Sequence, residues 1–139
     1  MRIVIFGLVA APLMLGAIGC SGLIDELPTT PDPVIVTEAF NGTLTVNGGV
    51  THPVFTTATG AVTATLTSLG DTPPPKVGFS IGTLTPGNNC NIVIANDSAV
   101  VTTVVTGTVS SLAGTLCVRV YDVGVLTGPV DYTFTVSHP

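Results

Sequence analysis

A two-residue alternation of apolar and polar side chains runs from about residue 35 to the end of the sequence. This alternation gives a β-strand one apolar face, whereas an amphipathic helix needs apolar residues three to four positions apart. No segment after residue 34 has helical spacing. Threonine and valine supply 23 and 21 of the 139 residues, and both favour strands because branching at Cβ restricts them in helices. The chain is therefore expected to be all-β.

About eight alternating segments are separated by clusters of glycine, proline and asparagine, which are typical of turns. Residues 91–95 are expected to carry Ile92 and Ile94 on one face, and residues 96–98 to form the next turn. Short antiparallel strands with one apolar face each bury those faces in a two-sheet antiparallel β-sandwich, here of jelly-roll-like form. A small closed barrel is the alternative. The expected strands are residues 40–46, 52–57, 62–66, 77–81, 91–95, 100–109, 116–120 and 132–136.

The chain carries little charge, and its balance is acidic. Only 8% of its residues are charged, and the formal net charge is −5. If residues 1–19 are removed, Lys76 and Arg119 face eight acids, which gives 2 − 8 = −6. Such a surface repels nucleic acid and anionic lipid headgroups, so no nucleic-acid partner is expected.

The first twenty residues have the form of an export signal. Met1-Arg2 is a short positive segment, and an uncharged apolar run follows at residues 3–18. The run ends in Ala17-Ile18-Gly19-Cys20, which resembles a bacterial lipobox, although leucine is usual where Ala17 stands. The resemblance implies that residues 1–19 are a lipoprotein signal peptide and that Cys20 receives a diacylglycerol and a fatty acid such as palmitate. An ordinary signal-peptidase site and a retained membrane anchor are the alternatives.

Residues 20–33 are expected to be a tether between the lipid and a folded domain at residues 34–139. Three prolines keep such a segment extended. Ser21 directly after Cys20 resembles lipoproteins of the outer membrane more than those retained at the inner membrane. The expected location is therefore the bacterial cell envelope, at the outer membrane or cell surface.

Three cysteines in an exported protein leave one without a partner. If Cys20 carries lipid, Cys90 and Cys117 remain as an even pair, and an oxidising compartment favours a disulfide between them. Two buried free thiols are the alternative.

Two regions resemble the bacterial prepeptidase C-terminal domain family. Residues 113–122 (AGTLCVRVYD) and 130–136 (VDYTFTV) are similar to the final hairpin of that family, and residues 40–44 with 54–56 to its opening hairpin. The resemblance covers about residues 36–137. It implies a small, non-catalytic, jelly-roll-like sandwich that accompanies secreted proteins, often peptidases. Residues 77–81 lack the carboxylates usual in the family's central strand, so calcium binding and collagen binding are not carried over.

Neither histidine lies near a nucleophile motif, so His52 and His138 are interpreted as solvated loop residues, and no catalytic residue is assigned. Arg119 is expected on an outer strand face beside Tyr121. Asp122 and Asp131 bracket the last loop, so a hairpin there would bring their carboxylates together as metal ligands. Hydrogen bonds within turns are the preferred interpretation for both residues. The remaining oxygen-bearing residues form a weak calcium candidate, for which turn chemistry is again preferred: Asn88, Asn89, Asn91, Asn96 and Asp97.

The sequence therefore predicts a lipid-anchored, exported, non-catalytic binding module with a protein or glycan ligand. The lipid is expected to hold it on a membrane, and no cofactor or metal site is predicted. A structural cell-envelope lipoprotein and a peptidase-associated accessory protein are the alternatives.

Overall fold

The computed structural model describes residues 30–111 and 114–139, and every regular element within them is a β-strand. Residues 32–139 form one unit. This confirms the prediction of an all-β domain with about eight strands. The strands are β1 (Val36–Leu44), β2 (Gly49–Thr56), β3 (Gly60–Ser68), β4 (Val77–Thr85), β5 (Asn89–Ala99), β6 (Val104–Val109), β7 (Gly114–Tyr121) and β8 (Val130–His138).

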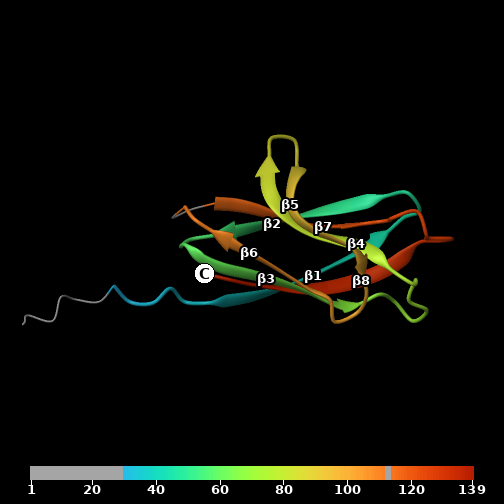
Figure 1. Ribbon diagram of the computed structural model, residues 1–139, viewed down its shortest axis with the longest axis horizontal. Coiled ribbons are helices and arrows are strands. Elements are labelled where there is room, and N and C mark those ends of the chain that lie inside the picture. Colours follow the sequence, from blue (N-terminus) through green and yellow to red (C-terminus); the bar gives the residue numbers. More distant parts are fainter. Residues whose placement is uncertain (1–29, 112–113) are drawn as a thin grey trace, which may run out of the picture. The chain divides into compact units, whose positions relative to one another are not determined.

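The strands form two four-stranded antiparallel sheets, as Figure 1 shows. Sheet A has the order β1-β8-β3-β6, and sheet B has the order β2-β7-β4-β5. The strands pair as in one long hairpin that has rolled up on itself: β1 with β8, β2 with β7, β3 with β6, and β4 with β5. This is the topology of a jelly roll, so the predicted two-sheet sandwich is confirmed and the closed barrel is excluded.

The rolled topology corrects one detail of the sequence interpretation. Residues 113–122 and 130–136 were expected to pair as a final hairpin, and residues 40–44 and 54–56 as an opening one. Both expectations are wrong, because β1 and β8 belong to sheet A while β2 and β7 belong to sheet B. Except for β4 and β5, strands that follow one another in sequence lie in different sheets, and β1 pairs with β8 instead.

A second correction concerns the turn expected at residues 96–98. These residues belong to β5, which continues to Ala99. The side-chain oxygen of Asn96 accepts the N–H of Ser98 at 2.9 Å, within an irregular part of the strand rather than at its end. The chain turns instead at residues 100–103, where Thr102 has a φ of +78°, and β6 begins at Val104.

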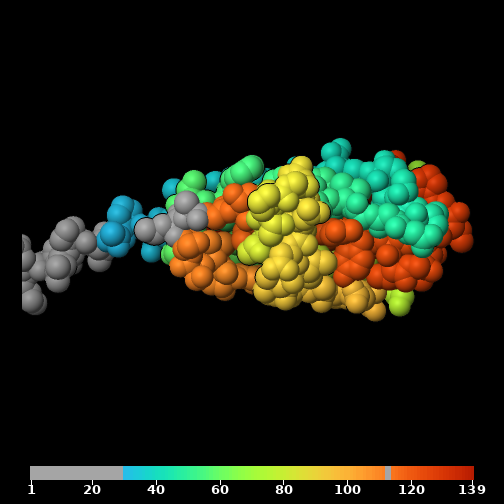
Figure 2. Space-filling model, turned by 90° about the horizontal axis from the view of Figure 1, so that it is seen from above, coloured from blue at the N-terminus to red at the C-terminus, as the bar shows by residue number. Residues whose placement is uncertain are grey.

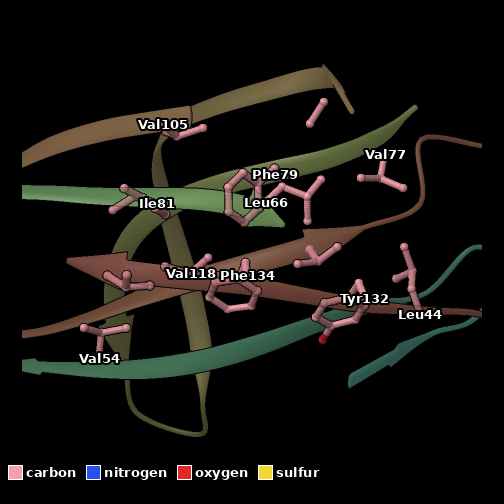
Figure 3. Close-up of a cluster of buried hydrophobic side chains, with 14 of the residues drawn as sticks. Leu44, Val54, Leu66, Val77, Phe79, Ile81, Val105, Val118, Tyr132 and Phe134 are labelled. Atoms are coloured by element: carbon pink, nitrogen blue, oxygen red, sulfur yellow. The ribbon is translucent and has the colours of Figure 1, made fainter. Parts of the chain in front are cut away.

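The core lies between the sheets and is built around three large rings, as Figure 3 shows. Phe134 of β8 has its ring centroid 5.6 Å from that of Phe79 on β4 and 6.2 Å from that of Tyr132. Aliphatic side chains from the inner faces of both sheets surround the rings. The fully buried large residues are Leu44, Val54, Val62, Leu66, Leu69, Val77, Phe79, Val118, Val120, Tyr132, Phe134 and Val136.

The outer face of sheet A is covered by hydroxyl groups. Hydrogen bonds of 2.8 Å join Thr37 to Ser137 and Thr67 to Thr133, across neighbouring strands. Threonine keeps strand propensity on such a face, and its hydroxyl group makes the face polar without charge. The alternation of the sequence is thus explained by one buried and one hydroxylated face.

Candidate interaction surface

A disulfide between Cys90 and Cys117 fixes the hairpin of β4 and β5 to sheet B. The two Cα atoms are 5.7 Å apart, although β4 lies between β5 and β7 in the sheet. Cys117 alternates with the buried Val118 and therefore points to the outer face of the sheet. The bridge thus lies on that outer face. The predicted pairing of these two cysteines is confirmed, and the alternative of two free thiols is wrong.

The hairpin bends where Gly82 of β4 meets β5. A Cβ atom on Gly82 would overlap the backbone oxygen of Asn91, so β5 approaches closer there than any side chain allows. The end of the hairpin projects from sheet B in Figure 1, and its yellow atoms lie uncovered on the face that Figure 2 shows. Glycine at the bend and the disulfide together determine where the hairpin leaves the sheet.

The bend coincides with a β-bulge that redirects the side chains of β5. Ile92 lies opposite Gly82 and Ile94 opposite Ile81, which leaves Val93 as an extra residue without a partner on β4. Neighbouring residues of β4 point to opposite faces, so Ile92 and Ile94 do as well. The expectation that Ile92 and Ile94 share a face is therefore wrong, because a bulge shifts the alternation by one residue.

The redirected side chains line a small apolar pocket between the edges of the two sheets, which we call the β5–β6 mouth. Its volume is about 80 Å³. Val93 and Ile94 both line it and Ile92 does not, in keeping with the bulge. The other lining residues come from four further strands, β3, β4, β6 and β7: Val62, Ile81, Gly82, Thr83, Gly107, Thr108 and Leu116.

Gly107 leaves the space for this pocket. It takes an inward position of β6 between the buried Val105 and Val109. A Cβ atom at Gly107 would lie 3.7 Å from the nearest atom of Ile94 and 3.8 Å from that of Ile81, which is ordinary packing distance. An alanine would fit there, so the missing side chain creates a gap that the surrounding packing does not require.

Strand β5 has the least protected edge of the sandwich. Ile92, Val93 and Ile94 are 42%, 67% and 39% exposed, and the one charge on this eleven-residue strand is Asp97. The other three edges carry the usual protection against strand addition. Pro53 leaves β2 without one backbone N–H, β6 has only six residues, and β1 carries the inward-pointing Glu38.

His52 is not a solvated loop residue, contrary to the sequence interpretation. It lies on the inner face of β2, half-buried, with Nε2 2.6 Å from the hydroxyl oxygen of Tyr132. Its ring also makes edge contacts with Phe40 and Phe134, at centroid distances of 5.6 and 5.1 Å. Burial lowers the pKa of His52 and raises the pKa of Tyr132 to about 12, so both groups are neutral at pH 7. A buried, neutral pair of this kind serves packing between the sheets.

His138 was also interpreted as a solvated loop residue, and this too is wrong. It ends β8, is buried, and has Nε2 3.3 Å from a carboxylate oxygen of Glu38 on β1. The contact links the first and last strands of the domain. The two histidines therefore have different partners, Tyr132 for His52 and Glu38 for His138.

The oxygen-bearing residues near β5 make turn and strand contacts. Asn89 donates its side-chain amide to the carbonyl oxygen of Pro86, and Asn88 has a φ of +59° in the same turn. Asp97 accepts a hydrogen bond from Tyr121 on β7. Within residues 30–111 and 114–139, no three His, Cys, Asp or Glu residues are grouped in a way that suits a metal ion.

Asp122 and Asp131 serve different segments and do not meet across a hairpin. Asp122 follows β7 and accepts the N–H groups of Gly124 and Val125 at 2.8 and 2.9 Å on one oxygen, and that of Asn47 at 2.8 Å on the other. These bonds, above all the one from Asn47, lower the pKa of Asp122. Asp131 accepts a hydrogen bond of 2.6 Å from Thr43 across sheet A.

Arg119 and Tyr121 lie on the outer face of sheet B, as the sequence predicts. The Tyr121 ring covers Gly78, and the Arg119 guanidinium covers Gly49, because a Cβ atom on either glycine would clash with it. Burial and the hydrogen bond to Asp97 raise the pKa of Tyr121 to about 12. These side chains cover backbone rather than surround a cavity.

Sequence reasoning missed the β5–β6 mouth because it depends on a bulge and on contacts between distant strands. The alternation predicts a regular strand at Ile92-Val93-Ile94, although three consecutive branched residues do not specify a face. A glycine at position 107 within a valine-rich strand was the other available signal.

No protein-family model matches this chain, and no curated protein sequence is significantly similar to it. The similarity to the prepeptidase C-terminal domain family stays a prediction. Cys20 and the apolar run at residues 3–18 lie outside the residues that the structure describes. Within the described part of the chain, no helix is long and apolar enough to cross a membrane.

Proposed function

We propose that this protein is a lipid-anchored, exported, non-catalytic interaction module that binds its partner at the β5–β6 mouth. The observation that carries the proposal is the mouth itself, where exposed Ile92, Val93 and Ile94 adjoin an apolar pocket. Exposed aliphatic groups beside a pocket mark a binding site more often than scattered ones do. The disulfide next to the mouth holds the hairpin in place, which lowers the entropy cost of binding.

The lipid anchor rests on the sequence around Cys20. A lipobox-like end to an apolar run, followed by a proline-containing tether at residues 20–33, suits a protein that is held at a membrane and displayed away from it. At about 3.1 Å per residue, an extended tether of this length reaches roughly 40 Å. A disulfide in the domain agrees with an oxidising compartment outside the cytoplasm.

A binding role is favoured over an enzymatic one by the surroundings of the histidines. His52 is half-buried against Tyr132 and Phe134, and His138 is buried against Glu38. A general base needs to reach a proton on a substrate, and both side chains are engaged within the fold.

The anchor is tested with Cys20→Ser in the full chain. We expect the wild type in the membrane fraction with an incorporated palmitate analogue, and the variant either uncleaved or in the aqueous fraction without label. The double variant Cys90→Ser, Cys117→Ser is the matched control, because it keeps Cys20 and should stay labelled. An unlabelled wild type, or a Cys20→Ser variant that keeps its label, would overturn the anchor.

The binding surface is tested in intact cells with a photo-crosslinking residue at position 93. We expect a discrete adduct there and none with the same residue at position 106, on the outer face of sheet A. An adduct with a peptidase would favour the accessory role, and one with an abundant envelope component the structural role. Equal yields at both positions, or none at either, would overturn the assignment of the mouth as the binding surface.

A further inference from the structure

We propose that the β5–β6 mouth binds an extended polypeptide strand, which pairs with the edge of β5 and inserts one aliphatic side chain into the pocket. This inference rests on the proposed function and names the chemistry of the partner. It follows from the backbone of β5, the size of the pocket and the charge around it.

The backbone of β5 indicates a polypeptide. This strand ends sheet B and pairs only with β4, so its outer N–H and C=O groups face away from the sheet. Such a row of donors and acceptors is the template on which another extended chain adds as a strand. Sugars and acyl chains lack the regular spacing of amides that would satisfy these groups.

The pocket indicates the side chain. A cavity of about 80 Å³ is about half the size of the roughly 150 Å³ cavity that accepts a benzene ring, so an aromatic side chain does not fit. A branched aliphatic group such as that of valine or leucine suits this space. The pocket is lined mainly by Val62, Ile81, Val93, Ile94 and Leu116, which offer no polar partner from their side chains.

The acidic charge of the domain favours a strand from another protein over a second copy of this chain. The described residues contain two cations and six acids, a formal charge of 2 − 6 = −4, so two copies repel each other. Stable dimers also bury about 20–30 residues on each side, whereas the exposed aliphatic part of β5 is three residues long. A segment with aliphatic residues at its centre and basic residues at its ends complements this site.

The test uses the full chain in detergent and a fluorescent nine-residue peptide, Lys-Thr-Val-Thr-Leu-Thr-Val-Thr-Lys, whose binding is followed by anisotropy. A second peptide with the same side chains and an N-methyl group on every amide between its terminal residues has no N–H donor on either edge and cannot pair as a strand. We expect the first peptide to bind and the N-methylated peptide not to bind. Absence of binding by the first peptide, or equal binding of both, would overturn strand addition.

Gly107→Ala tests the pocket. The added methyl group fits at ordinary packing distance and should leave the fold intact, yet it removes space that the leucine of the peptide needs. We expect the affinity to fall about tenfold, the effect typical of one methyl group in an apolar pocket. Gly128→Ala is the matched control, since nothing lies within 4 Å of its Cβ position, and should bind as the wild type does.

Unchanged affinity in Gly107→Ala would overturn insertion into the pocket. This failure is distinct from failure of the proposed function. If position 93 crosslinks in cells and the peptide does not bind, the surface stands and the strand mechanism is wrong.

Discussion

The imidazole of His52 on β2 lies 2.6 Å from the hydroxyl oxygen of Tyr132 on β8, and this hydrogen bond joins one sheet of the sandwich to the other. Tyr132 is 1% exposed, so its hydroxyl group needs a partner inside the protein. The aromatic rings of Phe40 and Phe134 also make edge contacts with the His52 ring. The sheets are therefore held together by a directional contact as well as by aliphatic packing.

The burial of His52 predicts a loss of stability in mild acid. Burial lowers the pKa of His52 below its ordinary value of 6.5, so the unfolded chain binds a proton that the folded chain excludes. The stability that the neutral His52 side chain provides is fully present above pH 6.5, the pKa of His52 in the unfolded chain. It is lost as the pH falls from 6.5 toward the lower pKa of His52 in the folded chain. Urea unfolding between about pH 8 and pH 5 should show this slope, and His52→Gln should flatten it.

Tyr132→Phe is the control for that experiment. It removes the hydrogen bond, which costs about 1 kcal/mol, but leaves His52 half-buried. Because burial lowers the pKa of His52, the free energy of unfolding of this variant should still fall as the pH drops below 6.5. A flat profile in the wild type would contradict the assignment of a buried neutral imidazole.

Removal of the disulfide should destabilise the domain without changing its fold. Cys90 and Cys117 are 27 residues apart, and closing a loop of this length contributes about 3–4 kcal/mol by the chain-entropy model. The double variant Cys90→Ser, Cys117→Ser should therefore unfold at lower urea concentration, measured by circular dichroism. The reduced wild type should match the variant, and a stability equal to that of the oxidised wild type would rule out this contribution.

Gly82→Ala should be more harmful than Gly107→Ala, although both place a methyl group on a strand glycine. At Gly82 the methyl group meets the backbone of Asn91 and forces β5 away, at a cost of about 1–3 kcal/mol. At Gly107 the nearest atoms are 3.7 Å away, and the change should be neutral. Unfolding free energies of the two variants test this order. Equal stability of both variants would show that β5 does not depend on the close approach.

Asp122 is expected to stabilise the loop before β8 until strong acid protonates it. The pKa of Asp122 is lowered by backbone N–H groups, chiefly that of Asn47. The stability that the ionised carboxylate provides is therefore fully present above pH 3.8, the ordinary pKa, and is lost as the pH falls through the lowered pKa of the folded chain. Asp122→Ala should melt earlier than wild type at neutral pH, with a smaller difference at about pH 2. Asp122→Asn keeps one acceptor oxygen, so its melting temperature should lie between those of Asp122→Ala and the wild type. A constant difference at all pH values would exclude a role for the ionised carboxylate.

The alternation of the sequence was sufficient for the class of the fold and for much of its core. Val118 and Val120 are buried while Arg119 and Tyr121 face outward, as their spacing predicts. The cysteine pair was also predictable, because two cysteines remain once Cys20 is assigned to the lipid. These features depend on residues close in sequence or on simple counting.

The positions of the histidines were not predictable in the same way. His52 precedes Pro53, and His138 is one residue from the end of the chain, both of which are typical of loops. Only the rolled topology brings β8 beside β1 and its Tyr132 across from β2. Burial of a polar side chain depends on which distant strands pack against it, and local spacing carries no information on that.

The order of residues alone predicts that this chain forms strands with one apolar face and that two of its cysteines are able to pair. Three features become visible only in the folded domain: which strands are neighbours, where the bulge at Val93 shifts the alternation, and how Gly107 opens a pocket beside it. Alternation is a property of one strand, with a period of two residues. A bulge, a pocket and an open edge are properties of strands in contact, and they exist only after the long hairpin has rolled into two sheets.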